Sequence, residues 1–197
     1  MEKTLNEMSL EELWRLFPIF LVEHKREWQD WYGDEKENIL SLLPKGMGKR
    51  ISHIGSTAIP GIWAKNIVDI LLETEDREGM LKAKEVLADN GWICMSQEAD
   101  RISMNKGYTK EGFAEKVFHI HIRLFGDNSE LYFRDYLCEN LKAAKEYEQL
   151  KLSLQQKFEY NRDGYTEAKS EFIQKYTDIA RKKYSGRYKG SYSFEGK

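Results

Sequence analysis

The stretch Lys65-Asn-Ile-Val-Asp-Ile-Leu-Leu-Glu73 carries the strongest indication of fold in this sequence. Residues 66–73 form a nearly continuous apolar run, which is typical of a central strand covered on both faces of a sheet. Because side chains alternate along a strand, Asp69, Leu71 and Glu73 are expected on one face. A carboxylate inside such a strand is costly unless it is paired or liganded. Asp69 is therefore a candidate site residue, with a structural ion pair as the alternative interpretation.

Upstream of this run, His53-Ile-Gly-Ser-Thr-Ala-Ile-Pro-Gly61 leads from a short predicted strand into a polar turn. Gly55 lets a ligand approach the backbone because it has no Cβ atom. Ser56 and Thr57 offer hydroxyl and backbone N–H groups, which suit a phosphate at the start of a helix. The alternative is an ordinary strand-to-helix turn with a Ser or Thr cap.

Downstream, His119-Ile-His121-Ile-Arg123 lies in an alternating segment that predicts a further strand. The three polar side chains share one face of that strand. Two histidines at this spacing can converge on one metal ion, or bind one anion together with Arg123. A lone histidine is more often a hydrogen-bonded core residue, which is the alternative for each of these rings.

The other segments predict one α+β domain, residues 1–184, followed by a flexible tail, residues 185–197. Its centre is a mixed sheet of about five strands, and helices from the N-terminal and C-terminal parts flank it. The predicted strands are residues 50–54, 66–73, 92–95, 101–106 and 117–125.

Helices are predicted where apolar residues recur at a spacing of three or four. The N-terminal helical segment, residues 9–43, is expected to break or kink at Pro18. The C-terminal segment, residues 129–184, is expected to break at residues 161–164. Between the predicted strands, residues 77–90 form a shorter amphipathic helix.

Composition excludes several classes of protein. Of the 197 residues, 41% are hydrophobic and 32% are charged, which is typical of a globular chain and not of a disordered one. The net charge of −2 gives no general attraction to nucleic acid or to an anionic membrane. The chain has no apolar run of membrane-spanning length and no secretory pattern at its start. Two widely spaced cysteines indicate reduced thiols and a cytoplasmic location.

Several basic residues on the predicted helices are weaker candidates. Arg134 and Lys169 are candidates for phosphate binding, although most helical lysines and arginines are simply solvated. A basic and tyrosine-rich cluster near the C-terminus, including Arg181 and Arg187, has the composition of a weak RNA-binding tail. We favour a solubilising chain end for it, so a nucleic-acid partner is not expected.

Five segments, in the same order and at similar spacing, resemble the GrpB family, and together they cover most of residues 14–180. The resemblance implies a nucleotidyltransferase-like fold. In nucleotidyltransferases a Gly-Ser turn holds the triphosphate, and three carboxylates on two strands hold divalent metal. The similar segments are His53-Ile-Gly-Ser-Thr-Ala-Ile-Pro-Gly61, Ala64-Lys-Asn-Ile-Val-Asp-Ile-Leu71, His119-Ile-His121, Phe133-Arg-Asp-Tyr-Leu137 and Tyr165-Thr-Glu-Ala-Lys169.

The chain departs from the nucleotidyltransferase pattern at its carboxylates. Asp69 matches the first position, but Leu71 stands at the second and cannot ligate a metal. Glu73 is on the same face but about 13 Å further along the strand, too far to share a metal ion with Asp69. His119 and His121 occupy the strand of the third carboxylate. One aspartate with histidines favours Mn²⁺, Fe²⁺, Zn²⁺ or Ni²⁺ over Mg²⁺.

The predicted ligand is a nucleotide or another phosphorylated small molecule. Asp69, His119 and His121 are the predicted catalytic and metal-binding residues, for a divalent Mn, Mg or Zn ion. Nucleotidyl or phosphoryl transfer, metal-dependent hydrolysis and ligand binding without catalysis all stay open, as does a homodimer. The predicted phosphate-binding residues are His53, Gly55, Ser56, Thr57, Lys65, Arg123, Arg134 and Lys169.

Overall fold

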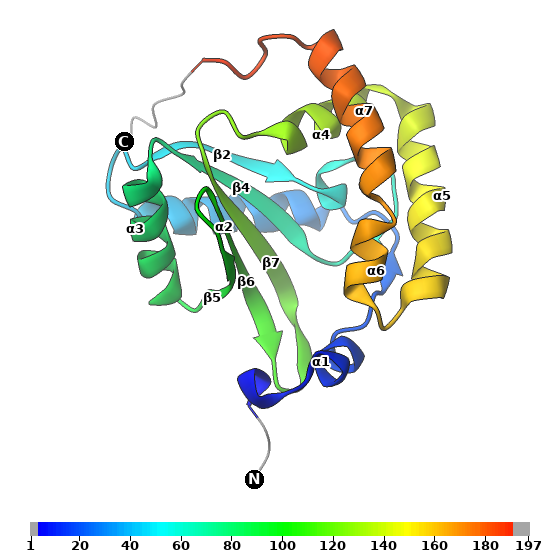
Figure 1. Ribbon diagram of the computed structural model, residues 1–197, viewed down its shortest axis with the longest axis horizontal. Helices are drawn as coiled ribbons and strands as arrows, with labels where there is room; N and C mark the ends of the chain where they lie inside the picture. The colour runs from blue at the N-terminus through cyan, green and yellow to red at the C-terminus, as the bar shows by residue number, and fades with distance from the viewer. Residues whose placement is uncertain (1–3, 191–197) are drawn as a thin grey trace.

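The computed structural model describes residues 4–190. Its centre is a five-stranded mixed sheet in the order β2-β4-β7-β6-β5 (Figure 1). Strands β4 and β7 pair in parallel, and the other neighbours are antiparallel. The predicted α+β class is thus confirmed. The strands are β2 (Gly48–Ile54), β4 (Val68–Thr74), β5 (Ile93–Gln97), β6 (Arg101–Thr109) and β7 (Gly112–Leu124).

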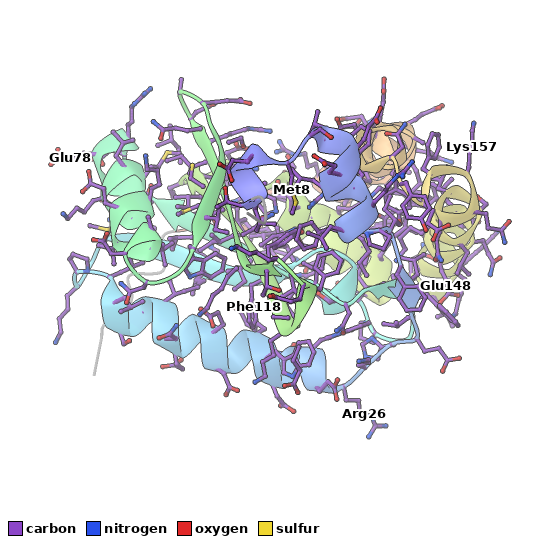
Figure 2. All side chains as sticks on the ribbon, turned by 90° about the horizontal axis from the view of Figure 1, so that it is seen from below. Met8, Arg26, Glu78, Phe118, Glu148 and Lys157 are labelled. Atoms are coloured by element: carbon purple, nitrogen blue, oxygen red, sulfur yellow. The ribbon has the colours of Figure 1, made fainter. Side chains whose placement is uncertain are left out.

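Helices lie on both sides of this sheet. Seen from below, α2 crosses one face (Figure 2), and α3 packs against the same core. On the other face, Leu131 of α4 packs on Ile54 and Leu71 of the sheet. The helices are α1 (Leu10–Leu16), α2 (Glu27–Leu42), α3 (Arg77–Ala88), α4 (Ser129–Glu139), α5 (Leu141–Phe158), α6 (Arg162–Glu167) and α7 (Ser170–Lys183).

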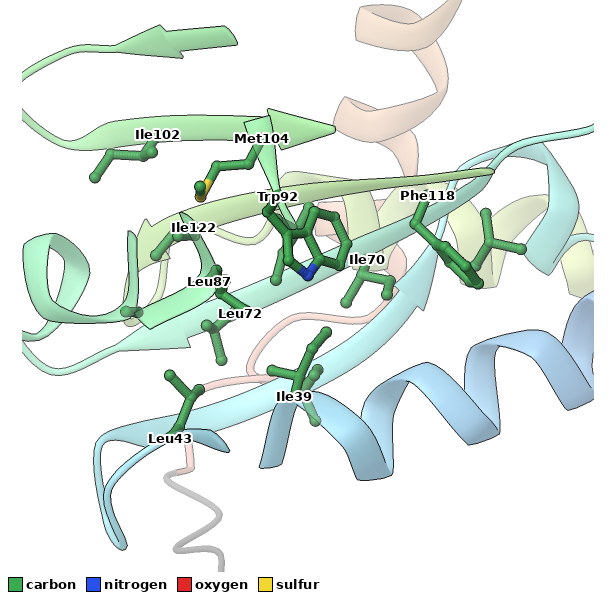
Figure 3. Packing of buried hydrophobic residues seen from close by; sticks show 14 of the residues in the cluster. Ile39, Leu43, Ile70, Leu72, Leu87, Trp92, Ile102, Met104, Phe118 and Ile122 are labelled. Carbon is green, nitrogen blue, oxygen red and sulfur yellow. The ribbon is translucent and has the colours of Figure 1, made fainter. Parts of the chain in front are cut away.

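Strand β4 is the central strand that the apolar run predicted. Ile70 and Leu72 are fully buried on the face toward α2 and α3. They pack there with Ile39 and Leu87 in the main hydrophobic core (Figure 3). Asp69, as predicted, lies on the opposite face of the strand. The alternation along β4 therefore assigns one face to stability and leaves the other available for polar groups.

The N-terminal segment differs from the single kinked helix that was predicted. Helix α1 ends at Leu16, because the residue before Pro18 disfavours helical backbone. The chain then forms β1 (Leu21–Val22), which pairs antiparallel with β3 (Ala64–Lys65). Strands of two residues have no detectable alternation, so this small second sheet could not be predicted.

The β6–β7 hairpin is longer than the predicted strands. Strand β6 continues to Thr109 and β7 begins at Gly112, so a two-residue turn joins them. The ladder is irregular at Gly107, which has a φ of 90°. A Cβ atom there would lie 2.4 Å from the carbonyl oxygen of Lys116, so only glycine fits this bulge.

In the C-terminal half, the predicted break at residues 161–164 is the start of a helix instead. The Asn161 side chain accepts a hydrogen bond from the backbone N–H of Gly164 at 2.9 Å and so caps α6. The helical segment is interrupted at residues 159–161, between α5 and α6, and again between Glu167, where α6 ends, and Ser170, where α7 begins. These two connections and the one at Asn140 join the four C-terminal helices.

The first part of the predicted flexible tail packs on α4. Arg187 forms an ion pair with Asp135 at 2.7 Å, and the Tyr188 hydroxyl donates to the same carboxylate. The main chain of Tyr188 and Gly190 accepts hydrogen bonds from Arg50. Residues 191–197 lie outside the described part of the chain. Within residues 4–190, no helix has the length and apolarity that a membrane crossing requires.

Candidate functional site

A cavity of about 730 Å³ lies where the polar face of β4 and β7 meets the C-terminal helices. This volume is in the range of sites for small-molecule ligands. The β2–β4 connection forms one wall and α5, α6 and α7 form another (Figure 1). The predicted site residues that line it are Gly55, Ser56, Thr57, Lys65, Asp69, His119, His121 and Lys169.

The parallel pairing of β4 and β7 brings Asp69 to the two histidines. Asp69 is the register partner of His119, and Leu71 is the partner of His121. The Nδ1 atom of His119 lies 3.1 Å from Oδ1 of Asp69, and Nε2 of His121 lies 3.8 Å from the same oxygen. The predicted convergence of these three side chains on one hollow is therefore observed.

Hydrogen bonds define the protonation of His119. Arg162 can only donate hydrogen bonds. Its Nη2 atom lies 3.3 Å from Nε2 of His119, and its Nη1 atom lies 3.1 Å from the Tyr108 hydroxyl oxygen. The Tyr108 hydroxyl lies 2.8 Å from the same Nε2 atom and donates to it. Nε2 is therefore an acceptor, and the His119 proton is on Nδ1, where it is donated to Asp69.

The pKa shifts agree with this chain of hydrogen bonds. Burial lowers the pKa of His119 to about 4, although Asp69 acts in the opposite direction. Burial raises the pKa of Asp69, but hydrogen bonds from His119 and His121 outweigh that effect and hold it well below its usual range. At neutral pH the pair is a carboxylate and a neutral imidazole, so Asp69 is a poor base.

This arrangement does not fit the predicted metal site at Asp69, His119 and His121. No group of three or more His, Cys, Asp or Glu side chains within residues 4–190 is placed to hold a metal ion. His119 has no free lone pair, because Nδ1 is protonated and Nε2 accepts other hydrogen bonds. Lys65 and Arg162 add positive charge beside it. Of the three predicted ligands, the Asp69 carboxylate and His121 are therefore the two that are left to coordinate a metal ion.

The two other positions on this face of β4, Leu71 and Glu73, add no carboxylate to the cavity. Leu71 is fully buried against Ile54 and Leu131. Glu73 is fully buried too and accepts hydrogen bonds from the Gly126 N–H at 2.9 Å and the Asn128 amide at 3.1 Å. Glu73 therefore stabilises the loop after β7, which agrees with the prediction that it is too far along the strand to share a metal with Asp69.

Cationic side chains dominate the cavity instead. Lys65, Lys151, Arg162 and Lys169 line it. Burial, together with Arg162 and Lys169, lowers the pKa of Lys65 to about 7. Burial, with the charges of the neighbouring lysines, lowers that of Lys151 to about 7 as well, and burial lowers that of Lys169 to about 8. In each case the largest cause is the loss of hydration of the ammonium group on burial, which disfavours its charged form.

The Gly-Ser turn is packed tightly against Asp69. Gly55 has a φ of 71°, and a Cβ atom there would lie 2.3 Å from Oδ2 of Asp69. The helix that was predicted to follow the turn is a 3-10 helix of only three residues, Ser56–Ala58. So short an element has no helix dipole of consequence. The predicted phosphate site at a helix start is thus reduced to the hydroxyl and N–H groups of the turn itself.

Three predicted phosphate-binding residues lie outside the cavity. The His53 ring stacks on Tyr32, and its Nε2 atom forms a hydrogen bond with Oγ1 of Thr57 at 2.9 Å. His53 therefore stabilises the turn and does not face the cavity. Arg134 donates to the carbonyl of His53 at 2.8 Å and to Asp135. Arg123 is buried beside acidic groups, 3.8 Å from Asp127 and 4.0 Å from Glu130. Local acceptors therefore hold both arginines away from a ligand, which corrects their predicted roles.

Sequence reasoning missed several residues of the cavity. Lys151, 2% exposed, donates to the carbonyl of Trp63, and Glu148 of the same helix accepts from the Trp63 N–H at 2.8 Å. Together they anchor the chain just before Lys65. Arg162 falls in the predicted break, and Tyr165 begins one of the segments that resemble the GrpB family but is not among the predicted site residues. One feature of the sequence could have identified Lys151 as a buried residue, because a lysine stands there on the apolar face of a helix.

The buried Lys151 predicts an unusual pH dependence of stability. Between pH 7 and 10.5 the unfolded chain holds the Lys151 proton that the folded protein has lost, so the free energy of unfolding rises with pH. The substitution Lys151→Met removes this contribution. The free energy of unfolding of the variant, relative to that of wild type, should be highest below pH 7. This difference should decrease by a few kcal/mol toward pH 10, because one pKa unit corresponds to about 1.4 kcal/mol.

Urea denaturation at pH 6 to 10 measures this difference, with Lys142→Met as the matched control, because Lys142 is exposed on the same helix. For each variant, the quantity compared is its free energy of unfolding minus that of wild type. If this difference is independent of pH for Lys151→Met, as expected for Lys142→Met, the shifted pKa of Lys151 is contradicted.

The fold and the site define an α+β protein with a five-stranded mixed sheet and a lysine-rich cavity beside a Gly-Ser turn. The chain belongs to the GrpB family: the family described as "GrpB protein" matches residues 18–178. This confirms the resemblance found in the sequence motifs.

Curated relatives and a solved structure are similar to this chain. "Glutamate-rich protein GrpB" of Alkalihalophilus pseudofirmus is 32% identical over 160 residues, which are 79% of this chain and 91% of the relative. "UPF0157 protein YqkA" of Bacillus subtilis is 28% identical and matches 89% of this chain, which spans about half (52%) of that protein. The crystal structure of GrpB from Enterococcus faecalis has a TM-score of 0.73 at 29% identity, over 84% of this chain and 99% of that one.

Proposed function

We propose that this protein binds a phosphorylated small molecule, such as a nucleotide, in the cavity between the sheet and helices α5–α7. One observation carries the proposal: five cationic side chains line one cavity together with three carboxylates, those of Asp69, Glu130 and Asp178. The cations are Lys65, Lys151, Arg162, Lys169 and Arg181. Five cations and three anions leave a net charge of about +2 when all of them are ionised. Phosphate and diphosphate groups have the negative charge that such a cluster lacks.

Two of these cations are available to a ligand. Within residues 4–190, the ammonium groups of Lys65 and Lys169 have no hydrogen bond or ion pair; they only lie near the Tyr165 ring, at 5.7 and 4.3 Å from its centroid. The ammonium group of an exposed lysine is hydrated by solvent, whereas Lys65 and Lys169 are partly buried. An anion between them would restore the charge balance and raise their pKa values again.

Binding without phosphoryl transfer is the form of the proposal that the residues favour. Phosphoryl transfer in this fold class relies on divalent metal held by carboxylates. Here Leu71 replaces one carboxylate, and Asp69 is already engaged by two histidines. The ligand is therefore held by cationic side chains and by the polar groups of the Ser56–Ala58 turn, with no metal needed.

Ligand-induced stabilisation tests the proposal. Pyrophosphate and ATP, each with EDTA, should raise the melting temperature of the wild-type protein, because a ligand at 100 times its Kd adds about 2.7 kcal/mol of stability. The double variant Lys65→Met/Lys169→Met should bind roughly 100-fold more weakly. Each charge-assisted contact contributes on the order of 1.5–3 kcal/mol, and 1.4 kcal/mol is a factor of ten. Titration calorimetry gives the two Kd values.

The control is Lys142→Met/Lys157→Met, which removes the same charge from α5 outside the residues that line the cavity. Equal affinity of wild type and the cavity double variant would contradict the proposal. A shift that appears only when Mn²⁺ or Mg²⁺ is added would instead support the metal-dependent alternative.

A further inference from the structure

The amine of Lys65 is held on a rigid element inside the cavity. Lys65 ends strand β3 and pairs with Leu21 of β1. Its carbonyl accepts a hydrogen bond from the N–H of Ile67 at 2.7 Å. The preceding Trp63 main chain is clamped on both sides by Glu148 and Lys151. A side chain fixed in this way has a defined approach to whatever the cavity contains.

The surroundings of Lys65 favour the neutral amine, which is the nucleophilic form. Arg162 and Lys169 are cationic neighbours, and in the described chain no carboxylate forms an ion pair with Lys65. Its pKa of about 7 is the lowest, together with that of Lys151, among the cavity lysines. Lys151 is less suitable because its amine already donates to the carbonyl of Trp63. Lysines next to other cations or in dry pockets are the ones that act as nucleophiles.

An unpartnered hydroxyl in the same cavity points to a ligand oxygen. Tyr165 is 1% exposed, and its hydroxyl group has no hydrogen-bond partner among the described residues. Burial, with Tyr147 close by, raises the pKa of Tyr165 above its usual range, so it stays a donor. A buried donor without an acceptor is costly. Tyr165 lines the cavity, and the Lys65 amine lies 5.7 Å from the centroid of its ring. A ligand oxygen that reaches the hydroxyl would provide the missing acceptor.

We propose that the amine of Lys65 forms a reversible imine with the carbonyl carbon of a phosphorylated aldehyde or ketone held in the cavity. This inference rests on the proposed function, because Lys169 and Arg162 are assigned to the phosphate group of the same ligand. It adds a covalent step and a substrate class, and it needs no metal ion and no second reactant.

The step balances without an oxidant or reductant. The lone pair of the Lys65 nitrogen forms a bond to the carbonyl carbon, and the π electrons move to the oxygen, which takes up a proton. The nitrogen loses a proton, and a carbinolamine results. Loss of the oxygen as water then leaves the C=N double bond. Tyr165 donates a hydrogen bond to the carbonyl oxygen as negative charge develops on it.

Pyridoxal 5′-phosphate is a suitable probe because it has both an aldehyde and a phosphate group. The full-length protein is incubated with a slight excess of the probe, the imine is reduced with sodium borohydride, and the adduct is located by peptide mass spectrometry. Lys65 should be the dominant modified residue. Pyridoxal without the phosphate should label it at least 10-fold less, and excess pyrophosphate should suppress the labelling.

Two arginine variants test whether the amine of Lys65 forms the adduct. Lys65→Arg has no primary amine at this position, so it should lose the adduct. Lys142→Arg changes an exposed lysine outside the cavity, so it should keep both the adduct and the stabilisation by pyrophosphate. Labelling spread over exposed lysines, or an unchanged adduct in Lys65→Arg, would overturn the imine while phosphate binding stands. Absence of any pyrophosphate effect in wild type would instead overturn the proposed function. Mapping in wild type does not depend on the folding of a variant.

Discussion

Leu71→Asp is expected to lower the free energy of unfolding by several kcal/mol and to create no metal site. This substitution restores the aspartate that a nucleotidyltransferase has at that position, so it tests directly whether the chain has merely lost a ligand. Leu71 is fully buried against Ile54 and Leu131, and the new carboxylate would enter that apolar cluster unpaired. Burying an unpaired charge is among the largest destabilising effects of a single substitution.

Urea denaturation measures the loss, and Leu71→Met is the matched control. A methionine keeps the volume and apolar character of leucine, so it should cost less than about 1.5 kcal/mol. A Leu71→Asp protein as stable as Leu71→Met would contradict the packing described here. An Mn²⁺-dependent stabilisation of Leu71→Asp would contradict the conclusion that the site does not suit a metal.

Glu73→Ala is expected to cost about 3–5 kcal/mol of stability. Glu73 is fully buried, and its carboxylate faces Arg50 at 3.4 Å, the N–H of Gly126 and the amide of Asn128. Removing it leaves two donors without their acceptor and breaks the ion pair with the buried guanidinium of Arg50. Breaking one side of a buried pair in this way is more destabilising than never having the pair.

The exposed neighbour Glu75 provides the control for this measurement. Its side chain is 71% exposed and pairs with Lys49 at the surface, so Glu75→Ala should change stability by less than about 1 kcal/mol. Glu73→Gln keeps an acceptor oxygen and should fall between the two. Similar denaturation midpoints for Glu73→Ala and Glu75→Ala would show that the buried pair contributes little.

The parts of the fold that could be predicted are those with long, regular patterns. The apolar run around Ile70 indicated a central strand, and the alternation placed Asp69 and His119 on faces that the register then brought together. The two-residue strand that contains Lys65 has no such pattern. The start of α6 was also missed, because the Asn161 side chain that caps this helix also signals a loop.

The candidate site was only partly predictable, because local sequence cannot show which partner a cation finds. Arg123 and Arg134 share the composition of phosphate-binding residues, yet nearby acids and carbonyls bind them in the fold. Lys151 and Arg162 reach the cavity only through the packing of α5 and α6. Their contribution depends on tertiary geometry, which single-sequence patterns do not contain.

The cavity is assembled from two portions of the chain that are far apart in the sequence. Gly55, Asp69 and His119 come from the sheet, whereas Arg162 and Lys169 come from the helices that follow it. A ligand that contacts both groups would link them non-covalently. Ligand binding would therefore stabilise the packing of α6 and α7 against the rest of the domain. The backbone amides of α6 and α7 should then exchange their hydrogens more slowly when a ligand is bound, although these helices line one side of the cavity.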